Sequence, residues 1–210
     1  MVDFKHICFI LGLIIQSVSL YAQASNYIEL PYTSLQSIHL NLDECFSIQI
    51  NTQKDLEHVI VKSKSEGVYQ NQIRIKHEST KNQLQITTVF PPILNSGYDK
   101  LSAHKVLVFE VEITLPEKTT LYLKSNVGFV EVVGNYHFFN ANLNYGDIDF
   151  KAFTGNAKVA TYRGHIYMNT QDAHVKAESR NGKVEIENFN YKKHQIELKS
   201  VDGDIKLKSF

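Results

Sequence analysis

The stretch Gly146-Asp147-Ile148-Asp149-Phe150 decides the fold, because variants of it return at regular intervals along the second half of the chain. Glycines stand at Gly128, Gly146, Gly164, Gly182 and Gly203, in steps of 18, 18, 18 and 21 residues. The runs that follow them are F-V-E-V, D-I-D-F, H-I-Y-M, K-V-E-I and D-I-K-L. A fixed period near 20 residues with one strand-like run in each repeat is typical of a β-solenoid.

Apolar residues stand two and four positions after each glycine, and again seven and five positions before it. Because alternate side chains of a strand point to opposite faces, both runs predict strands with one buried face. The inward residues predicted after the glycines are Val130, Val132, Ile148, Phe150, Ile166, Met168, Val184, Ile186, Ile205 and Leu207. Those predicted before the glycines are Leu121, Leu123, Phe139, Ala141, Ala157, Val159, Val175, Ala177, Ile196 and Leu198.

We expect the turns to stack in sequence order, about 4.8 Å apart, with the glycines as structural corners. The three extra residues of the last step are predicted to bulge outward between Asn188 and Gln195. Open strand edges favour association, so we expect either a monomer, with Lys206 and Lys208 as edge charges, or a weak end-to-end oligomer.

The chain outside the repeats also alternates with period two, which predicts an all-β fold. Between residues 25 and 115 the strands are separated by uneven polar turns, and we expect N-terminal antiparallel strands that cap one end of the solenoid. The solenoid repeat region then extends from 116 to 210. The long segment from Phe90 to His104 is interpreted either as a binding loop or as a simple crossover.

Residues 1–24 have the features of a secretory signal peptide. Lys5 and His6 precede an apolar run from Ile7 to Ile15, and Ala22-Gln23-Ala24 forms a cleavage site. The run is short for a membrane anchor, and no later stretch is long enough to span a bilayer. The protein is therefore expected to be exported without a transmembrane anchor and to be periplasmic, cell-surface or secreted.

The composition argues against several function classes. Lys and Arg together number 22, as do Asp and Glu, and no polybasic segment indicates a nucleic-acid partner. After cleavage Cys45 is the single cysteine, which we interpret as a buried apolar residue in a strand, or alternatively as a catalytic or pairing thiol. The sequence has no phosphate-binding loop, dinucleotide fingerprint or nucleophile elbow, so no cofactor is expected. The histidines lack metal-ligand spacing, and Asp202 with Asp204 offers too few oxygens to predict calcium.

The best candidate for chemistry is the outward position that follows each glycine. Stacking in sequence order would place Asp147, His165 and Lys183 side by side, and Asp149, Tyr167 and Arg163 would lie nearby. Such a cluster fits acid–base chemistry, weak binding of a polar ligand, or a ladder of charges without function. Six tyrosines stand at predicted outward or corner positions of the repeats: Tyr122, Tyr136, Tyr145, Tyr162, Tyr167 and Tyr191. Such tyrosines fit contacts with a sugar or a protein, or an ordinary solvated strand face, and we include Tyr145, Tyr162 and Tyr167 in the candidate surface.

The proline turn I-T-L-P-E-K-T-T-L-Y-L and the glycine turns N-Y-G-D-I-D-F and S-V-D-G-D-I-K-L resemble the bacterial "putative adhesin" family that includes the head-GIN domains. The resemblance extends from Ser37 to Phe210 and is clearest from Phe109 onward. It implies a secreted or envelope-attached β-solenoid with an adhesive role and no catalytic residues. The turns here read Gly-Asp-Ile, Gly-His-Ile or Gly-Lys-Val, which departs from the Gly-Ile-Asn wording of that name.

Together these features predict a non-enzymatic, adhesin-like β-solenoid that presents a binding surface to a protein or a glycan. The candidate surface comprises Asp147, Asp149, His165, Tyr145, Tyr162 and Tyr167. One alternative is a carbohydrate-active enzyme that uses Asp147, Asp149 and His165 as acid–base groups. Another is an accessory protein of an envelope-stress system.

Overall fold

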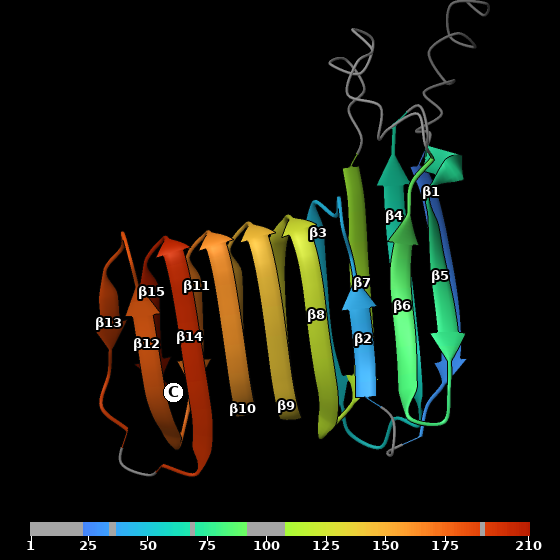
Figure 1. Cartoon of the computed structure of the whole chain (residues 1–210). Coiled ribbons are helices and arrows are strands. Elements are labelled where there is room, and N and C mark those ends of the chain that lie inside the picture. The colour runs from blue at the N-terminus through green and yellow to red at the C-terminus, as the bar shows by residue number, and fades with distance from the viewer. Residues whose placement is uncertain (1–22, 34–36, 68–69, 92–107, 190–191) are drawn as a thin grey trace, which may run out of the picture.

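The structure is a computed structural model that describes residues 23–33, 37–67, 70–91, 108–189 and 192–210. These residues form one open, all-β sheet, and the only helical element within them is a 3-10 turn, η1 (Gln70–Gln72) (Figure 1). The strands are β1 (Gln23–Pro31), β2 (Ser37–Asn41), β3 (Ser47–Gln53), β4 (His58–Glu66), β5 (Arg74–Ser79), β6 (Gln83–Val89), β7 (Val108–Pro116), β8 (Thr119–Val127), β9 (Phe129–Tyr145), β10 (Ile148–Arg163), β11 (Ile166–Thr170), β12 (Ala173–Ser179), β13 (Val184–Ile186), β14 (His194–Asp202) and β15 (Ile205–Ser209).

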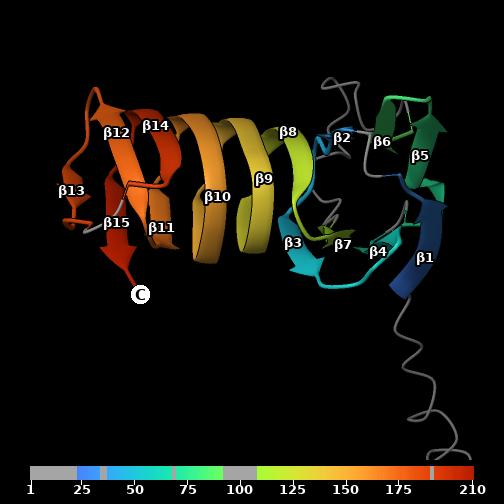
Figure 2. The ribbon, with the colours of Figure 1, turned by 90° about the horizontal axis from the view of Figure 1, so that it is seen from below.

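Most of the strands pair in parallel and form two stacks, and Figure 2 shows the chain passing repeatedly from one to the other. The first stack has the order β6–β2–β8–β9–β10–β14–β12, and the second has the order β7–β3–β9–β10–β11–β15–β13. The long strands β9 and β10 belong to both stacks, because they bend near Gly134 and Gly155, where φ is 117° and 139°. The sequence analysis did not predict this second set of bends.

We define a rung as a strand of the first stack, the corner at which the chain turns, and the following strand of the second stack. Each rung is named by its corner residue. The Gly128 rung contains β8 and the start of β9, and the Gly146 rung contains the end of β9 and the start of β10. The Gly164 rung contains the end of β10 and β11. The Gly182 rung contains β12 and β13, and the Gly203 rung contains β14 and β15. Strands β2 and β3 form a further rung, whose corner carbonyl comes from Cys45.

The order of the rungs in space differs from their order in sequence. β14 pairs with β10 and β15 pairs with β11, while β12 and β13 lie on the far side of this pair. The Gly203 rung is therefore inserted between the Gly164 and Gly182 rungs, and the predicted sequential stacking is wrong here. The chain crosses back by one rung between the end of β13 at Ile186 and the start of β14 at His194. The predicted outward bulge between Asn188 and Gln195 includes residues 190 and 191, which lie outside the described ranges.

This order also changes which strand carries the edge charges. Lys206 and Lys208 lie on β15, which has β11 on one side and β13 on the other, so they do not guard an edge as predicted. The N-terminal part contains a similar inversion, since β6 and β7 lie outside β2 and β3 although they follow them in sequence.

The region 25–115 is only partly antiparallel. β1 pairs with β4, β4 with β7, and β5 with β6 in antiparallel fashion, whereas β2, β3 and their neighbours in the stacks pair in parallel. The N-terminal region thus extends both stacks before the antiparallel strands begin. Residues 1–22 and most of the segment from Phe90 to His104 lie outside the described ranges, so neither the predicted signal peptide nor the predicted loop is described.

The core lies between the two stacks. Every predicted inward residue of the Gly128, Gly146, Gly164 and Gly203 rungs is buried, which follows from the period-two alternation. Tyr136, Phe139, Phe150 and Phe153 form an aromatic cluster with centroid separations of 5.1 to 5.5 Å between adjacent rings. Tyr136 was predicted at an outward or corner position, but it is buried in this cluster. Its hydroxyl donates to the carbonyl oxygen of Ile50 at 3.2 Å, which satisfies its polar atom. Burial of each large apolar side chain contributes about 1.5–3 kcal/mol.

The Gly182 rung does not follow this pattern. Val184 and Ile186 are 39% and 43% exposed, and Val175 and Ala177 are half-buried, although all four were predicted to be inward. Their side chains do face the interior side of the strands, but nothing in the described residues covers them from beyond the rung.

Cys45 is a free, buried thiol, as predicted, although it lies at a corner and not within a strand. Burial, with a smaller contribution from the nearby carboxylates of Asp43 and Glu44, raises its pKa. A raised pKa disfavours the thiolate, which is the reactive form of cysteine.

Candidate functional site

The corner residues stack so closely that no side chain fits between them. A Cβ on Gly146 would lie 1.8 Å from the carbonyl oxygen of Gly128, and one on Gly164 would lie 1.9 Å from that of Gly146. A Cβ on Gly203 would lie 1.9 Å from the carbonyl oxygen of Gly164. Each glycine therefore leaves room for the backbone of the adjacent rung, and its role in the site is to bring neighbouring corners together.

Hydroxyl groups three residues before the glycines complete these corners. Thr161 donates to the carbonyl oxygen of Gly146 at 3.4 Å, and Ser200 donates to that of Gly164 at 3.0 Å. Ser179 makes the same contact with Gly203 at 2.7 Å. The sequence analysis missed this position, although a hydroxyl three residues before four of the five glycines was a usable signal.

The outward position after each corner forms a ladder of side chain to backbone hydrogen bonds. Asp147 Oδ1 accepts from the backbone N–H of His165 at 2.7 Å, and His165 Nδ1 accepts from that of Asp204 at 2.9 Å. Asp204 Oδ1 then accepts from the N–H of Lys183 at 2.8 Å. The predicted neighbours Asp147 and His165 do meet, but Asp204 takes the place predicted for Lys183 beside the histidine, because the Gly203 rung is inserted there.

These bonds define what the ladder side chains do. Each one accepts from an amide of the next rung, and the acceptor role of His165 Nδ1 places the ring proton on Nε2. Asp147 and His165 therefore join rungs, and they are not aimed at each other as an acid–base pair would be.

Asp149 and Tyr167 lie opposite each other on adjacent strands of the second stack. Asp149 forms an ion pair with Lys151, and this hydrogen bond raises the pKa of the lysine. The Tyr167 ring stacks on His165 with centroids 5.9 Å apart. The carboxylate of Asp149, which was predicted to be an acid–base group, is thus already in an ion pair on an open strand face.

Tyr145 and Tyr162 lie next to each other at the corners of adjacent rungs. They are 49% and 50% exposed, and their rings meet edge to face at 6.5 Å. The Arg163 guanidinium carbon lies 5.9 Å from each ring centroid, and its Nε lies 3.4 Å from Asp202 Oδ2. Hydrogen bonds from Asn181 and, to a smaller extent, from Arg163 lower the pKa of Asp202. The arginine is held over the two rings by this carboxylate.

Three exposed apolar residues continue the surface from Tyr145 toward the N-terminal rungs. Phe46, Val127 and Phe129 line a shallow groove of about 500 Å³ together with Tyr145 and Arg163. We call Phe46, Val127, Phe129, Tyr145, Tyr162 and Arg163 the corner patch. Phe46 was missed in the sequence analysis, because Cys45 occupies the corner where the repeat would have a glycine. Val127 was missed as well, although it directly precedes the recognised corner Gly128.

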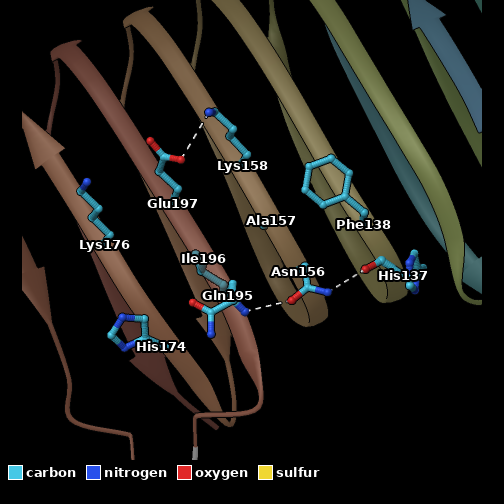
Figure 3. A pocket seen from close by; sticks show the side chains of 10 residues that line it. All are labelled: His137, Phe138, Asn156, Ala157, Lys158, His174, Lys176, Gln195, Ile196 and Glu197. Carbon is cyan, nitrogen blue, oxygen red and sulfur yellow. Dashed lines mark hydrogen bonds and ion pairs between the residues drawn. The ribbon is translucent and has the colours of Figure 1, made fainter.

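A second hollow, of about 620 Å³, lies on the outer face of the first stack (Figure 3). Asn156 crosses its floor, donating to the carbonyl oxygen of His137 and accepting from the N–H of Gln195. Glu197 is paired with Lys158 at 3.3 Å and with Lys199 at 3.2 Å, and hydrogen bonds from these lysines lower its pKa. The hollow contains none of the predicted site residues, and its carboxylate is already neutralised.

Within the ranges that the structure describes, no group of three or more His, Cys, Asp or Glu side chains is arranged to hold a metal ion. None of these residues belongs to a helix of the length and apolar character needed to cross a membrane.

Comparison with known proteins places the chain in a family. Among solved structures, a "putative cell adhesion protein" from Clostridium sporogenes matches 90% of this chain and 100% of its own, with a TM-score of 0.63 and 20% identity. A "putative adhesin" from Bacteroides fragilis matches 88% of this chain and 97% of its own, with a TM-score of 0.39 and 12% identity. No curated protein matches. The Toastrack DUF4097 family model matches residues 36–210, and the chain therefore belongs to the Toastrack DUF4097 family.

Proposed function

We propose that this protein is a non-enzymatic, adhesin-like protein of the cell envelope that binds a protein partner through the corner patch. The observation that carries the proposal is the exposure of Phe46 at 65%, with Phe129 at 41% and Val127 at 40%, on one continuous surface with two exposed tyrosines. A cluster of exposed apolar side chains on a soluble surface marks an interaction site.

The composition of the corner patch favours a protein over a glycan. Tyrosine and arginine are enriched among the residues that dominate binding energy at protein interfaces. Phe46, Val127 and Phe129 offer no hydrogen bonds to sugar hydroxyls, whereas they suit apolar side chains of a partner protein. Arg163 and Asp202 provide the polar border that such interfaces have around an apolar centre.

The local chemistry supports binding more than catalysis. The acid–base candidates Asp147 and His165 accept hydrogen bonds from backbone amides, and Asp149 is paired with Lys151. A carbohydrate-active enzyme would need two carboxyl groups flanking a substrate bond. If Asp147→Asn abolished the release of new reducing ends from a polysaccharide incubated with the purified protein, the enzymatic alternative would replace this proposal.

The finer features of the proposal rest on the sequence and on the fold. We interpret the stacked rungs as a β-solenoid with two inverted steps, related to the head-GIN type of adhesin. The fold is shared with a protein called a "putative cell adhesion protein". Export follows from the predicted signal peptide, and cell fractionation with and without residues 1–24 tests it.

A site-specific crosslinking experiment tests the corner patch. A photoreactive amino acid placed at Phe129, and separately at Tyr27 on β1 as a control, is exposed to the envelope proteins of the source cells. A partner captured only from position 129 is then purified, and its Kd is measured. Tyr145→Ala and Phe46→Ser should each weaken binding by about 10- to 30-fold, because truncated anchor residues cost about 2 kcal/mol.

Tyr27→Ala is the matched control, since Tyr27 is 55% exposed but lies outside the corner patch. Tyr167→Ala shows whether the contact extends onto the second stack. Unchanged affinity in both patch variants, or specific binding to a glycan array that Tyr145→Ala reduces, would contradict a protein-binding corner patch.

A further inference from the structure

The Gly182 rung ends both stacks with unpaired strand edges. Among the described residues β12 pairs only with β14, and β13 pairs only with β15 (Figure 1, left end). Each strand therefore presents a row of backbone N–H and C=O groups on its outer side. Such edges template the addition of another strand, and natural proteins usually protect them.

The same rung leaves the interior of the stacks uncovered. Val184 and Ile186 are 39% and 43% exposed, whereas Ile205 and Leu207 at the equivalent positions of the adjacent rung are at most 1% exposed. At the opposite end the outer strand β5 is protected differently, because its exposed side chains include Arg74, Lys76 and Glu78. Among the described residues, the Gly182 end thus combines the open edges of β12 and β13 with apolar side chains that face outward along the stack.

We propose that a second copy of this chain covers the Gly182 rung, with β12 pairing antiparallel to β12 of the other copy across a two-fold axis. The charges on β12 support this partner. Lys176 and Glu178 are two residues apart and are both exposed on the outer face of the strand. They lie opposite Glu197 and Lys199 of β14 in the register, but neither forms an ion pair within the described residues. By contrast, Glu197 on the adjacent β14 is paired with two lysines.

One register of the self-pairing satisfies both charges. When the axis passes through Ala177, Lys176 of each copy lies directly opposite Glu178 of the other, which gives two ion pairs. On the inner side the same register sets Val175 opposite Ser179. A shift of the axis to Lys176 would place the two lysines against each other, so the charge pattern selects the first register. In this antiparallel arrangement, the exposed Val184 and Ile186 of each copy lie at the end of the stacks that the other copy covers.

The contact is limited to one rung, in which β12 has 7 residues and β13 has 3. An interface of this size falls below that of stable dimers, so the association should be reversible and concentration-dependent. Because this interface lies on the Gly182 rung and not on the corner patch, it is independent of the function proposed above.

Sedimentation velocity of the purified mature protein from about 1 to 300 µM tests the proposal. We expect a monomer–dimer equilibrium within this range. Lys176→Glu and Glu178→Lys should each weaken dimerisation by about tenfold or more, because each places like charges opposite each other twice. The double variant, with both substitutions, restores the complementary pairs and should recover dimerisation.

Lys124→Glu on β8 is the matched control, since Lys124 is an exposed lysine on an inner strand of the same stack. It should leave the equilibrium unchanged, and far-UV circular dichroism should show that all variants remain folded. A wild-type protein that stays monomeric throughout the range would overturn the proposal and favour a strand of another protein. Single variants that dimerise like the wild type, or a double variant that does not recover, would also overturn it.

Discussion

The Gly164 and Gly182 rungs have nearly the same sequence pattern but different surroundings. G-H-I-Y-M and G-K-V-E-I both place aliphatic residues two and four positions after the glycine. Ile166 and Met168 are fully buried between neighbouring rungs, whereas Val184 and Ile186 are exposed. Burial at equivalent positions is therefore set by the place of the rung in the stack, and the energetic cost of a substitution should follow that place.

The largest expected difference between the two rungs comes from a charge at the first inward position. Ile166→Asp should lower the free energy of unfolding by more than about 4 kcal/mol, because a buried carboxylate would lack a partner. Val184→Asp should cost less than about 1 kcal/mol, because water reaches that side chain. Urea unfolding of dilute protein, followed by circular dichroism, measures both values. Equal losses would show that the two rungs are equally covered.

The corner glycines should show a smaller difference of the same kind. Gly146→Ala forces a Cβ to within 1.8 Å of the carbonyl oxygen of Gly128, between rungs that cannot separate, and should cost about 3 kcal/mol. Gly182→Ala makes a similar contact with Gly203 at 2.1 Å, but the end corner can shift outward, so we expect about 1 kcal/mol. Thermal unfolding of the two variants compares them, and a greater loss for Gly182→Ala would contradict the rung order.

The hydroxyl groups three residues before the corner glycines provide a finer test of the difference between inner and end rungs. Thr161→Val removes a buried donor and leaves the carbonyl oxygen of Gly146 with one partner fewer, which should cost about 1–2 kcal/mol. Ser179→Ala removes the equivalent contact with Gly203 at the end rung, where water can replace it, and should cost less than about 1 kcal/mol. Both can be measured by urea unfolding, with Ser209→Ala on β15 as a surface control.

The smallest effect concerns the joint between the Gly164 and Gly203 rungs. His165→Ala removes the acceptor for the N–H of Asp204 and should cost about 1 kcal/mol. His165→Asp retains an acceptor like that of Asp147, so its stability should lie within about 0.5 kcal/mol of the wild type. Hydrogen exchange of the Asp204 amide reports the bond directly. Faster exchange in both variants would show that the carboxylate does not replace the imidazole.

The strands and their inward faces could be predicted from the sequence because alternation and period are local properties. The order of the rungs could not, since β12 and β14 alternate in the same way and either could pair with β10 by pattern alone. One physical signal was available in side-chain size. The Gly203 rung carries Ile196 and Leu198 where the Gly182 rung carries Val175 and Ala177, and the rung with the larger apolar side chains gains more from the inner place.

The candidate site was predictable to a similar degree. The outward position of Tyr162 follows from strand alternation, whereas Tyr145 has the phase of the inward residues and is exposed because it directly precedes the corner. The neighbours of His165 depended on rung order, so Asp204 was not expected beside it. Phe46 was missed because its corner is formed by Cys45, and only the three-dimensional register of β3 with β9 brings it next to Phe129.

The inverted step also constrains how the chain can acquire its structure during synthesis. β12 and β13 leave the ribosome before β14 and β15, yet they pair with nothing else in the described residues. Until residues 194–209 emerge, the nascent chain carries two unpartnered strands beside an unfinished β10 and β11. The last two rungs must therefore form together, because the Gly182 rung has no strand partner in the described residues until the Gly203 rung has been made.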